Sequence, residues 1–217
     1  MKGCTDFSGN SNKKHYLHYI TGGKSVMRDK IRIGFAMTGS FCTFSKVIKT
    51  LEDMSKKYDI TAILSNHSAT MDTKFGKADV LYNHLSDITK KPIIDSIVKA
   101  EPIGPQGLFD VLVVAPCTGN TLAKLSNSII DGTVPMAVKS HLRRERPVVI
   151  AISTNDGLSG SAENIGRLLN RKNYYFVPFK QDAPNEKPRS LVANMDLIPD
   201  TIDYALENKQ IQPIIYS

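Results

Sequence analysis

Residues 31–65, IRIGFAMTGSFCTFSKVIKTLEDMSKKYDITAILS, set the fold class. The apolar runs at 31–37 and 60–65 each predict a short buried strand. Between them, apolar side chains from Phe44 to Leu51 recur at the spacing of one helix face. A strand, a helix and a second strand in such a short stretch form a βαβ unit, which requires a parallel sheet and a right-handed crossover.

The rest of the chain continues this alternation. Apolar runs predict further strands at 111–115, 147–153 and 174–177, and helical spacing predicts helices at 78–88, 93–98, 121–130, 135–142 and around 165–169. We therefore predict an α/β protein built on a doubly wound parallel sheet in a single domain. Pro116 is expected to stop its strand. Residues 66–76 are expected to form a loop, 101–105 a rigid turn, 178–188 an extended arm, and 191–206 a helical stretch interrupted near Pro199.

Composition excludes several classes of protein. The 217 residues include 28 Lys and Arg against 21 Asp and Glu, a net charge of +7, and three cysteines. So few cysteines form no disulfide framework and fit a reducing cytosol. No apolar run approaches the roughly 20 residues of a membrane span. Residues 1–30 hold six basic and two acidic residues, a net charge of +4. Residues 31–217 carry only the remaining +3, which does not favour a nucleic-acid partner.

Residues 1–29 are rich in Gly, Ser, Asn and Lys and show no apolar period. We predict a disordered basic leader at 1–29, or translated sequence upstream of a true start at Met27, followed by the folded domain at 30–217. A functional basic arm is the alternative.

Polar side chains follow each predicted strand, where an open parallel sheet binds its ligands. Thr38-Gly39-Ser40 suits a phosphate or caps the next helix. Ser65 begins a polar turn, and Thr118-Gly119-Asn120-Thr121 places several short polar groups at a strand-to-helix turn. Asn155 follows the fourth strand and caps a helix or contacts a ligand.

Other chemistries lack their patterns. The first loop is neither GxGxxG nor a GxxxxGK[ST] loop, which weakens a dinucleotide or ATP interpretation. The five histidines have no metal-ligand spacing, so we predict no metal site. Cys117 has no histidine near it in sequence and is expected to be a buried thiol.

Thr38-Gly39-Ser40, Ser65 and the segment from Ala115 to Thr121 together resemble the flavoprotein family of flavodoxin-like FMN proteins, which includes cysteine decarboxylases and flavin prenyltransferases. The resemblance implies a Rossmann-like, flavodoxin-like three-layer sandwich that binds FMN, with the phosphate at the first loop and the ring against the third. It also implies a homo-oligomer, a trimer or a multiple of trimers. The cofactor-binding residues implied are Thr38, Gly39, Ser40, Ser65, Ala115, Pro116, Thr118, Asn120 and Thr121.

A narrower resemblance runs from Ile31 to Ile215. The segments DSIVKAEPIGP, APCTGNTLAKLSNSIIDG and FVPFKQDAPNEKP are similar to one subunit of a two-subunit bacterial oxidoreductase that makes an aromatic dicarboxylate during sporulation. This implies a cytoplasmic protein of the mother cell, oxidising a small dicarboxylate beside a Rossmann-type partner subunit that could bring NAD(P). Asn155 is the candidate catalytic residue, orienting substrate or flavin. The candidate cations for the carboxylates are Lys124, His141, Arg143 and Arg144.

Two departures from the decarboxylases bear on the activity. Glu101-Pro102 occupies the region where they carry a histidine, and Ile152-Ser153-Thr154-Asn155 retains only the Asn of their P-x-M-N segment. Three hypotheses therefore stay open: a flavin-dependent oxidoreductase subunit, a non-catalytic scaffolding subunit with FMN weakly held or absent, and a stand-alone FMN-dependent decarboxylase.

Overall fold

The structure is a computed structural model that describes residues 20–21, 24–25 and 30–216. The first compact unit of the chain, Met1–Lys30, contains β1 (Ile20–Thr21) and β2 (Lys24–Ser25), which pair antiparallel. The rest of the predicted leader, at 1–19, 22–23 and 26–29, lies outside the described residues. The second unit, Ile31–Ser217, contains the α/β domain.

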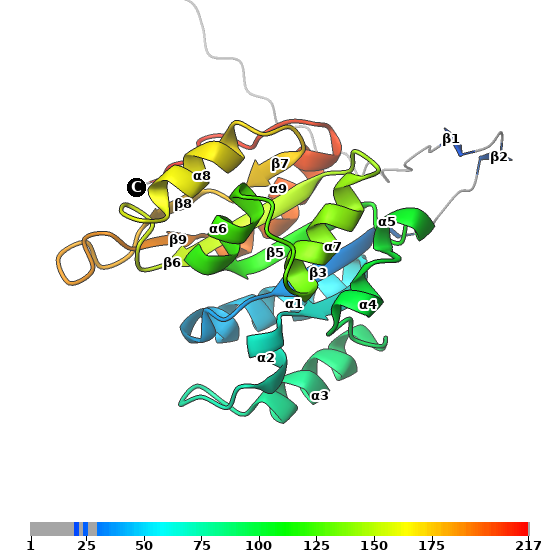
Figure 1. Cartoon of the computed structure of the whole chain (residues 1–217), viewed down its shortest axis with the longest axis horizontal. Coiled ribbons are helices and arrows are strands. Elements are labelled where there is room, and N and C mark those ends of the chain that lie inside the picture. Colours follow the sequence, from blue (N-terminus) through cyan, green and yellow to red (C-terminus); the bar gives the residue numbers. More distant parts are fainter. Residues whose placement is uncertain (1–19, 22–23, 26–29, 217) are drawn as a thin grey trace, which may run out of the picture. The chain divides into compact units, whose positions relative to one another are not determined.

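A parallel sheet forms the centre of the second unit (Figure 1). Its parallel strands are β3 (Arg32–Met37), β4 (Asp59–Leu64), β5 (Val111–Cys117), β6 (Val148–Thr154) and β7 (Tyr174–Phe176), in the spatial order β4-β3-β5-β6-β7. β7 pairs with the first half of β6, and β9 (Leu191–Ala193) pairs antiparallel with the last two residues of β6. β8 (Phe179–Gln181) pairs antiparallel with β9. The prediction of a doubly wound α/β domain is confirmed, with an antiparallel extension added at one edge.

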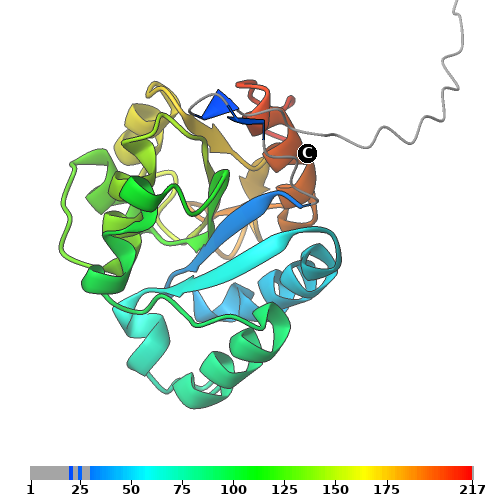
Figure 2. The same cartoon turned by 90° about the vertical axis from the view of Figure 1, so that its right-hand side faces the viewer.

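The order of the strands decides where the helices lie. The chain moves one way from β3 to β4 and the other way from β4 to β5, so right-handed crossovers place the connecting helices on opposite faces. Figure 2 shows α1 (Phe44–Lys57) and α9 (Ile198–Leu206) on one side of the sheet. The other side carries α6 (Gly119–Ser126), α7 (Thr133–Leu142) and α8 (Ala162–Leu169).

The core lies on both faces of the central strands. Every residue of β5 is buried, as are the first six of β6. Such continuous burial explains the unbroken apolar runs of these strands. On α1, the buried residues Val47, Leu51 and Met54 form the stripe that the sequence predicts.

The segment between β4 and β5 differs from the prediction at three places. Residues 66–76 are not wholly a loop, because Ser65 caps a short helix, α2 (Asn66–Thr70), ahead of α3 (Ala78–Thr89). Residues 93–96 are not helical, because Ile94 forms a β-bridge with Ile63, and only the last two residues of the predicted helix 93–98 belong to α4 (Ile97–Ala100). The predicted rigid turn contains α5 (Ile103–Gln106).

Two further predictions are wrong. Pro116 does not stop its strand, because β5 continues to Cys117 through a cis Ala115–Pro116 peptide and a shift in register. The predicted helical stretch 191–206 begins with β9 and a 3₁₀ turn at Met195–Leu197, and only α9 is an α-helix. β7 does not pair with the last residues of β6, so their backbone N–H and C=O groups need another partner. Residues 191–193 supply it by pairing as β9, although their local sequence pattern predicts a helix.

Candidate functional site

The loops after β3, β4 and β5 converge on one pocket at the carboxyl ends of the strands. This central pocket has a volume of about 460 Å³, within the range of small-molecule sites. It lies where the strand order reverses between β3 and β5, the expected place for a ligand in this architecture. Its polar lining includes Thr38, Gly39, Ser65, Asn66, His67, Thr118, Asn120, Thr121, Lys124, Asp131 and Thr133.

The Thr38 side chain joins the loop after β3 to the loop after β5 by hydrogen bonds. Its side chain is buried, and its hydroxyl donates to the carbonyl oxygen of Pro116 at 2.7 Å. The same hydroxyl accepts a hydrogen bond from the backbone N–H of Thr118 at 3.1 Å. Thr38 therefore joins the end of β3 to the end of β5, and only one lone pair of its oxygen is left for a ligand.

Ser65 and Thr118 are helix caps as well as pocket residues. The Ser65 hydroxyl accepts from the N–H of Ser68, and the Thr118 hydroxyl accepts from the N–H of Thr121. The Thr118 and Thr121 hydroxyls also lie 3.0 Å apart. Asn120 differs, because its exposed side chain lines the pocket next to the start of α6. It is the predicted residue with the most freedom to bind a ligand.

The two predicted glycines play different parts. Gly39 lies on the pocket wall, where an added Cβ would make only ordinary van der Waals contact with Phe41, and its backbone is not left-handed. A Cβ on Gly119 would lie 2.5 Å from the Ser161 hydroxyl and 2.6 Å from a carboxylate oxygen of Asp156. The lack of a side chain at Gly119 therefore lets α6 pack closely against the β6–α8 loop.

One candidate cation reaches the central pocket. The Lys124 ammonium lies 2.9 Å from a carboxylate oxygen of Asp131, and the Lys124 side chain is about three-quarters buried. The hydrogen bond from Lys124 lowers the pKa of Asp131. Sequence reasoning missed Asp131 because it lies in the irregular segment between α6 and α7.

The other candidate cations lie at the opposite end of the sheet. His141 is buried, and its Nε2 lies 3.1 Å from the carbonyl oxygen of Pro147, just before β6. The Arg144 guanidinium donates to the carbonyl oxygens of Gly104 and Pro105. Arg143 is on the same turn. A seven-residue strand is about 20 Å long, so these residues are too far from the site to contact a ligand there.

Ser40 and Asn155 line a second pocket beside the first. This hydroxyl pocket, about 230 Å³, shares Gly39 and Thr118 with the central pocket. Its other polar residues are Ser40, Thr43, Ser153, Thr154, Asn155, Asp182, Lys187 and Ser190. The Ser153 hydroxyl lies 2.8 Å from that of Ser40 and 2.7 Å from that of Thr43. The predicted site residues are thus divided between two adjoining pockets.

Three predicted positions line neither pocket. Ala115 and Pro116 are buried, and Pro116 contributes through its carbonyl oxygen, which Thr38 uses. Cys117 is fully buried, and burial raises the pKa of its thiol. The expectation of a buried thiol is confirmed.

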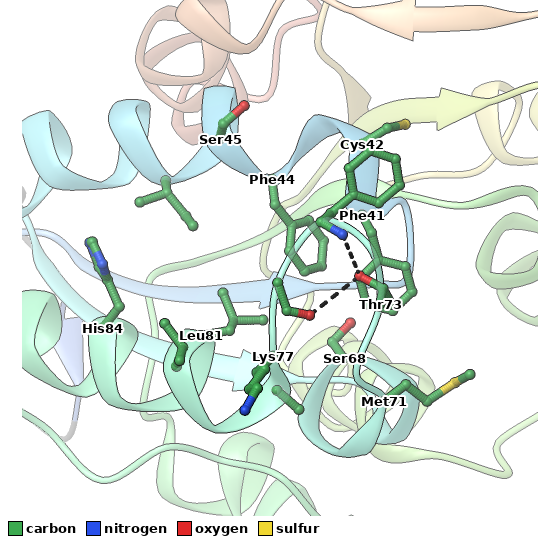
Figure 3. A pocket seen from close by; sticks show the side chains of 15 residues that line it. Phe41, Cys42, Phe44, Ser45, Ser68, Met71, Thr73, Lys77, Leu81 and His84 are labelled. Atoms are coloured by element: carbon green, nitrogen blue, oxygen red, sulfur yellow. Dashed lines mark hydrogen bonds between the residues drawn. The ribbon is translucent and has the colours of Figure 1, made fainter.

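A third, apolar pocket of about 250 Å³ adjoins the central one, sharing Phe41 and Met71 with it. Figure 3 shows Phe44 from α1 and Leu81 from α3 lining this apolar pocket, with Met71 at its edge. Met71, Phe75 and Val80 are about half exposed. Among the described residues, no cluster of His, Cys, Asp and Glu could hold a metal ion, and no helix is long and apolar enough to cross a membrane.

Comparisons with known proteins agree on one family. The family model described as "Flavoprotein" matches residues 20–196. The B subunit of dipicolinate synthase from Bacillus subtilis (strain 168) is 44% identical over 185 residues, 85% of this chain and 92% of that protein.

Solved structures extend the comparison. The crystal structure of the dipicolinate synthase B subunit from Bacillus halodurans C superposes with a TM-score of 0.80 at 43% identity, covering 88% of this chain and 99% of that one. The FMN-dependent cysteine decarboxylase SpaF superposes with a TM-score of 0.59 at 17% identity, covering 83% and 98%, a likeness that shows the fold.

Proposed function

The chain belongs to the flavoprotein family and, within it, to the dipicolinate synthase B subunits, and on that premise we propose that it is the FMN-binding oxidoreductase subunit of such a synthase. It acts with the A subunit in oxidising dihydrodipicolinate, or its hydroxylated precursor, to dipicolinate. NAD(P), where it takes part, enters through the A subunit. The protein works in the cytoplasm of the mother cell of a sporulating bacterium.

The observation that carries the FMN proposal is the convergence of three loops on the central pocket. Its volume of about 460 Å³ suits a cofactor, and its lining is polar where β3, β4 and β5 end. Asn120 and Thr121 lie in the first turn of α6, whose backbone N–H groups favour an anion. The residues present therefore fit a phosphorylated flavin.

Four residues are assigned to holding the cofactor. Gly39 and Ser65 line the pocket from the loops after β3 and β4, and Asn120 and Thr121 line it from the start of α6. Lys124 adds positive charge, which its ion pair with Asp131 keeps in place. Thr38 contributes by fixing the first and third loops to each other. When bound, FMN supplies an acceptor for the hydride that leaves the substrate during aromatisation.

Hydrogen bonds within the pocket wall also favour a second candidate function. The hydroxyl groups of Thr38, Ser65 and Thr118 each form a hydrogen bond within the protein. Such bonds stabilise the fold, and a stable fold is all that a non-catalytic scaffolding subunit needs to support the A subunit. Glu101 and Pro102 line neither the central nor the hydroxyl pocket, so the described residues offer no support for a stand-alone decarboxylase.

A flavin titration followed by an activity assay tests the proposal. The chain is co-purified with the A subunit, its flavin absorbance is recorded, and dihydrodipicolinate oxidation is measured with and without each subunit. We expect Asn120→Ala to weaken FMN binding about tenfold. Asn170→Ala, an exposed asparagine at the end of α8, is the matched control and should leave FMN binding unchanged.

Absence of flavin, with full complex activity retained in Asn120→Ala, would overturn the oxidoreductase role and favour the scaffold. Decarboxylation of a cysteinyl substrate by the isolated chain would favour the third hypothesis.

A homo-oligomer, a trimer or a multiple of trimers, is part of the same proposal. The half-exposed Met71, Phe75 and Val80 around the apolar pocket support self-association, because a large exposed apolar patch often marks an interface. Sedimentation velocity of Phe75→Ser, with Leu169→Ser on α8 as the control, measures it. An unchanged mass for Phe75→Ser would contradict this surface as the contact.

A further inference from the structure

We propose that the hydroxyl pocket binds a carboxylate of the dicarboxylate substrate and that Lys187 is the cation that selects it. This inference deepens the proposed function and rests on it. Lys187 lies between β8 and β9, in the segment that the sequence predicted as an extended arm. Among the described residues that line this pocket, Lys187 is the only one with a positively charged side chain.

The backbone around Lys187 is fixed while its side chain is loosely held. Its N–H donates to the carbonyl oxygen of Ala183 at 2.7 Å, and its carbonyl oxygen accepts from the N–H of Ser190 at 3.0 Å. The ammonium lies 3.6 Å from a carboxylate oxygen of Asp182, and the Lys187 side chain is about half exposed. Such an exposed pair is weak and can exchange one carboxylate for another.

Asp182 is the better anchored partner of that pair. The buried Ser190 hydroxyl donates to its carboxylate and also lies within 3.4 Å of the Asn155 side-chain oxygen. Asp182 therefore holds the Lys187 ammonium beside the pocket before substrate arrives. A substrate carboxylate entering the pocket replaces Asp182 as the partner, and the charge of Lys187 stays compensated in both states.

The three hydroxyls at the other side of the pocket complete the site. Ser40 and Thr43 each lie within 2.8 Å of the Ser153 hydroxyl, whereas the Ser40–Thr43 separation is 3.4 Å. Three hydroxyls carry three protons, and the two short contacts use two of them. The third proton is available to an external acceptor such as a carboxylate oxygen.

The position of the hydroxyl pocket suits a substrate that must meet a cofactor. Its shared walls with the central pocket, Gly39 and Thr118, place the two ligands side by side. The other candidate cations do not reach the hydroxyl pocket, since Lys124 lines the central pocket and His141 lies at the far end of the sheet.

Calorimetric titration with pyridine-2,6-dicarboxylate, the reaction product, tests the assignment on the full chain with and without FMN. We expect Lys187→Gln to weaken binding about tenfold or more, Lys187→Arg to retain most of it, and Lys172→Gln to change nothing. Lys172 is an exposed lysine paired weakly with Glu145 at the opposite end of the sheet. Binding of pyridine-2-carboxylate should be weaker than that of the dicarboxylate, and Lys187→Gln should shrink that difference.

In the complex with the A subunit, Lys187→Gln should raise KM more than it lowers kcat. Equal affinity of the wild type and Lys187→Gln for the dicarboxylate would overturn the inference. So would a variant of the hydroxyl pocket itself, such as Ser40→Ala, that loses FMN but keeps the dicarboxylate, because that result would assign the hydroxyl pocket to the flavin phosphate. Lys187-dependent dicarboxylate binding by a chain that binds no FMN would leave this inference standing while the FMN proposal fails.

Discussion

The hydroxyl of Thr38 donates a 2.7 Å hydrogen bond to the carbonyl oxygen of Pro116, 78 residues further along the chain. The bond joins the end of β3 to β5 at the place where the strand order reverses. Because the same hydroxyl accepts from the N–H of Thr118, one side chain sets the spacing of the first and third loops. The shape of the central pocket depends on that spacing.

Removing this hydroxyl should loosen both loops. Thr38→Val keeps the shape of the side chain but leaves the Thr118 N–H without its partner and weakens the bonding of Pro116. We expect the free energy of unfolding to fall by about 1–3 kcal/mol, with weaker FMN binding. Urea denaturation and flavin titration measure the two effects. Thr38→Ser keeps the hydroxyl and should lie close to the wild type; equal losses in both variants would contradict this role.

Gly119 should not tolerate a methyl group. In Gly119→Ala the added Cβ meets the Ser161 hydroxyl and the Asp156 carboxylate, so α6 must move away from the β6–α8 loop. We expect about 1–3 kcal/mol of destabilisation and weaker cofactor binding. Gly166→Ala on α8 is the matched control, because no atom lies within 4 Å of its added Cβ. That variant should be neutral or more stable by roughly 0.5–1 kcal/mol.

The buried ion pair between Arg32 and Asp110 should be important for stability. The Arg32 guanidinium lies 2.7 Å from the Asp110 carboxylate, whose side chain is 7% exposed, and the Arg146 guanidinium lies 3.6 Å away. Asp110→Asn removes the charge that compensates the Arg32 guanidinium, and we expect a loss of roughly 3 kcal/mol in denaturant unfolding.

The exposed Asp53–Lys56 pair provides the comparison. Asp53→Asn should leave the unfolding midpoint unchanged within error. A similar shift in both variants would show that the burial of Asp110 is not what matters.

Stability should fall in mild acid because of His141. Burial lowers the pKa of His141 to about 4, whereas in the unfolded chain the imidazole titrates near its ordinary value of 6.5. The unfolded state therefore binds a proton first, so this contribution is complete above pH 6.5 and is lost as the pH falls toward 4. The full effect is on the order of 3 kcal/mol.

Denaturation curves at about pH 7 and pH 5, on either side of the ordinary histidine pKa, measure this loss. His141→Gln should flatten the pH dependence, while His67→Gln, an exposed histidine on α2, should leave it as in the wild type. A wild-type midpoint that is the same at both pH values would contradict the expected loss.

The regular part of the fold could be predicted because its signals are local. The apolar runs of β3 to β7 and the buried stripe of α1 report on burial directly. Helix α2 was missed because Asn66 to Thr70 carry no apolar stripe, and the helix is started by the Ser65 cap. Ile93 and Ile94 were misassigned because a short apolar run looks alike in a helix and in extended chain.

The site was predicted only in part. The loops after β3, β4 and β5 were correctly placed around one pocket, because parallel strands present their carboxyl ends at the same edge. Lys187 was missed, since a lysine in a proline-rich segment has no pattern that separates it from a solvated charge. The arm brings it to the hydroxyl pocket because β8 pairs with β9, and β9 with β6.

By itself, the sequence determined the α/β class, the parallel βαβ core and the loops that carry polar groups, because burial and turn formation depend on neighbouring residues. Only the tertiary structure decided which hydroxyls form hydrogen bonds within the protein and which line a pocket. Thr38 finds its partner 78 residues away and Thr43 finds Ser153 across 110 residues. Such hydrogen bonds depend on the order of the strands in the sheet, and that order cannot be predicted from the local sequence pattern.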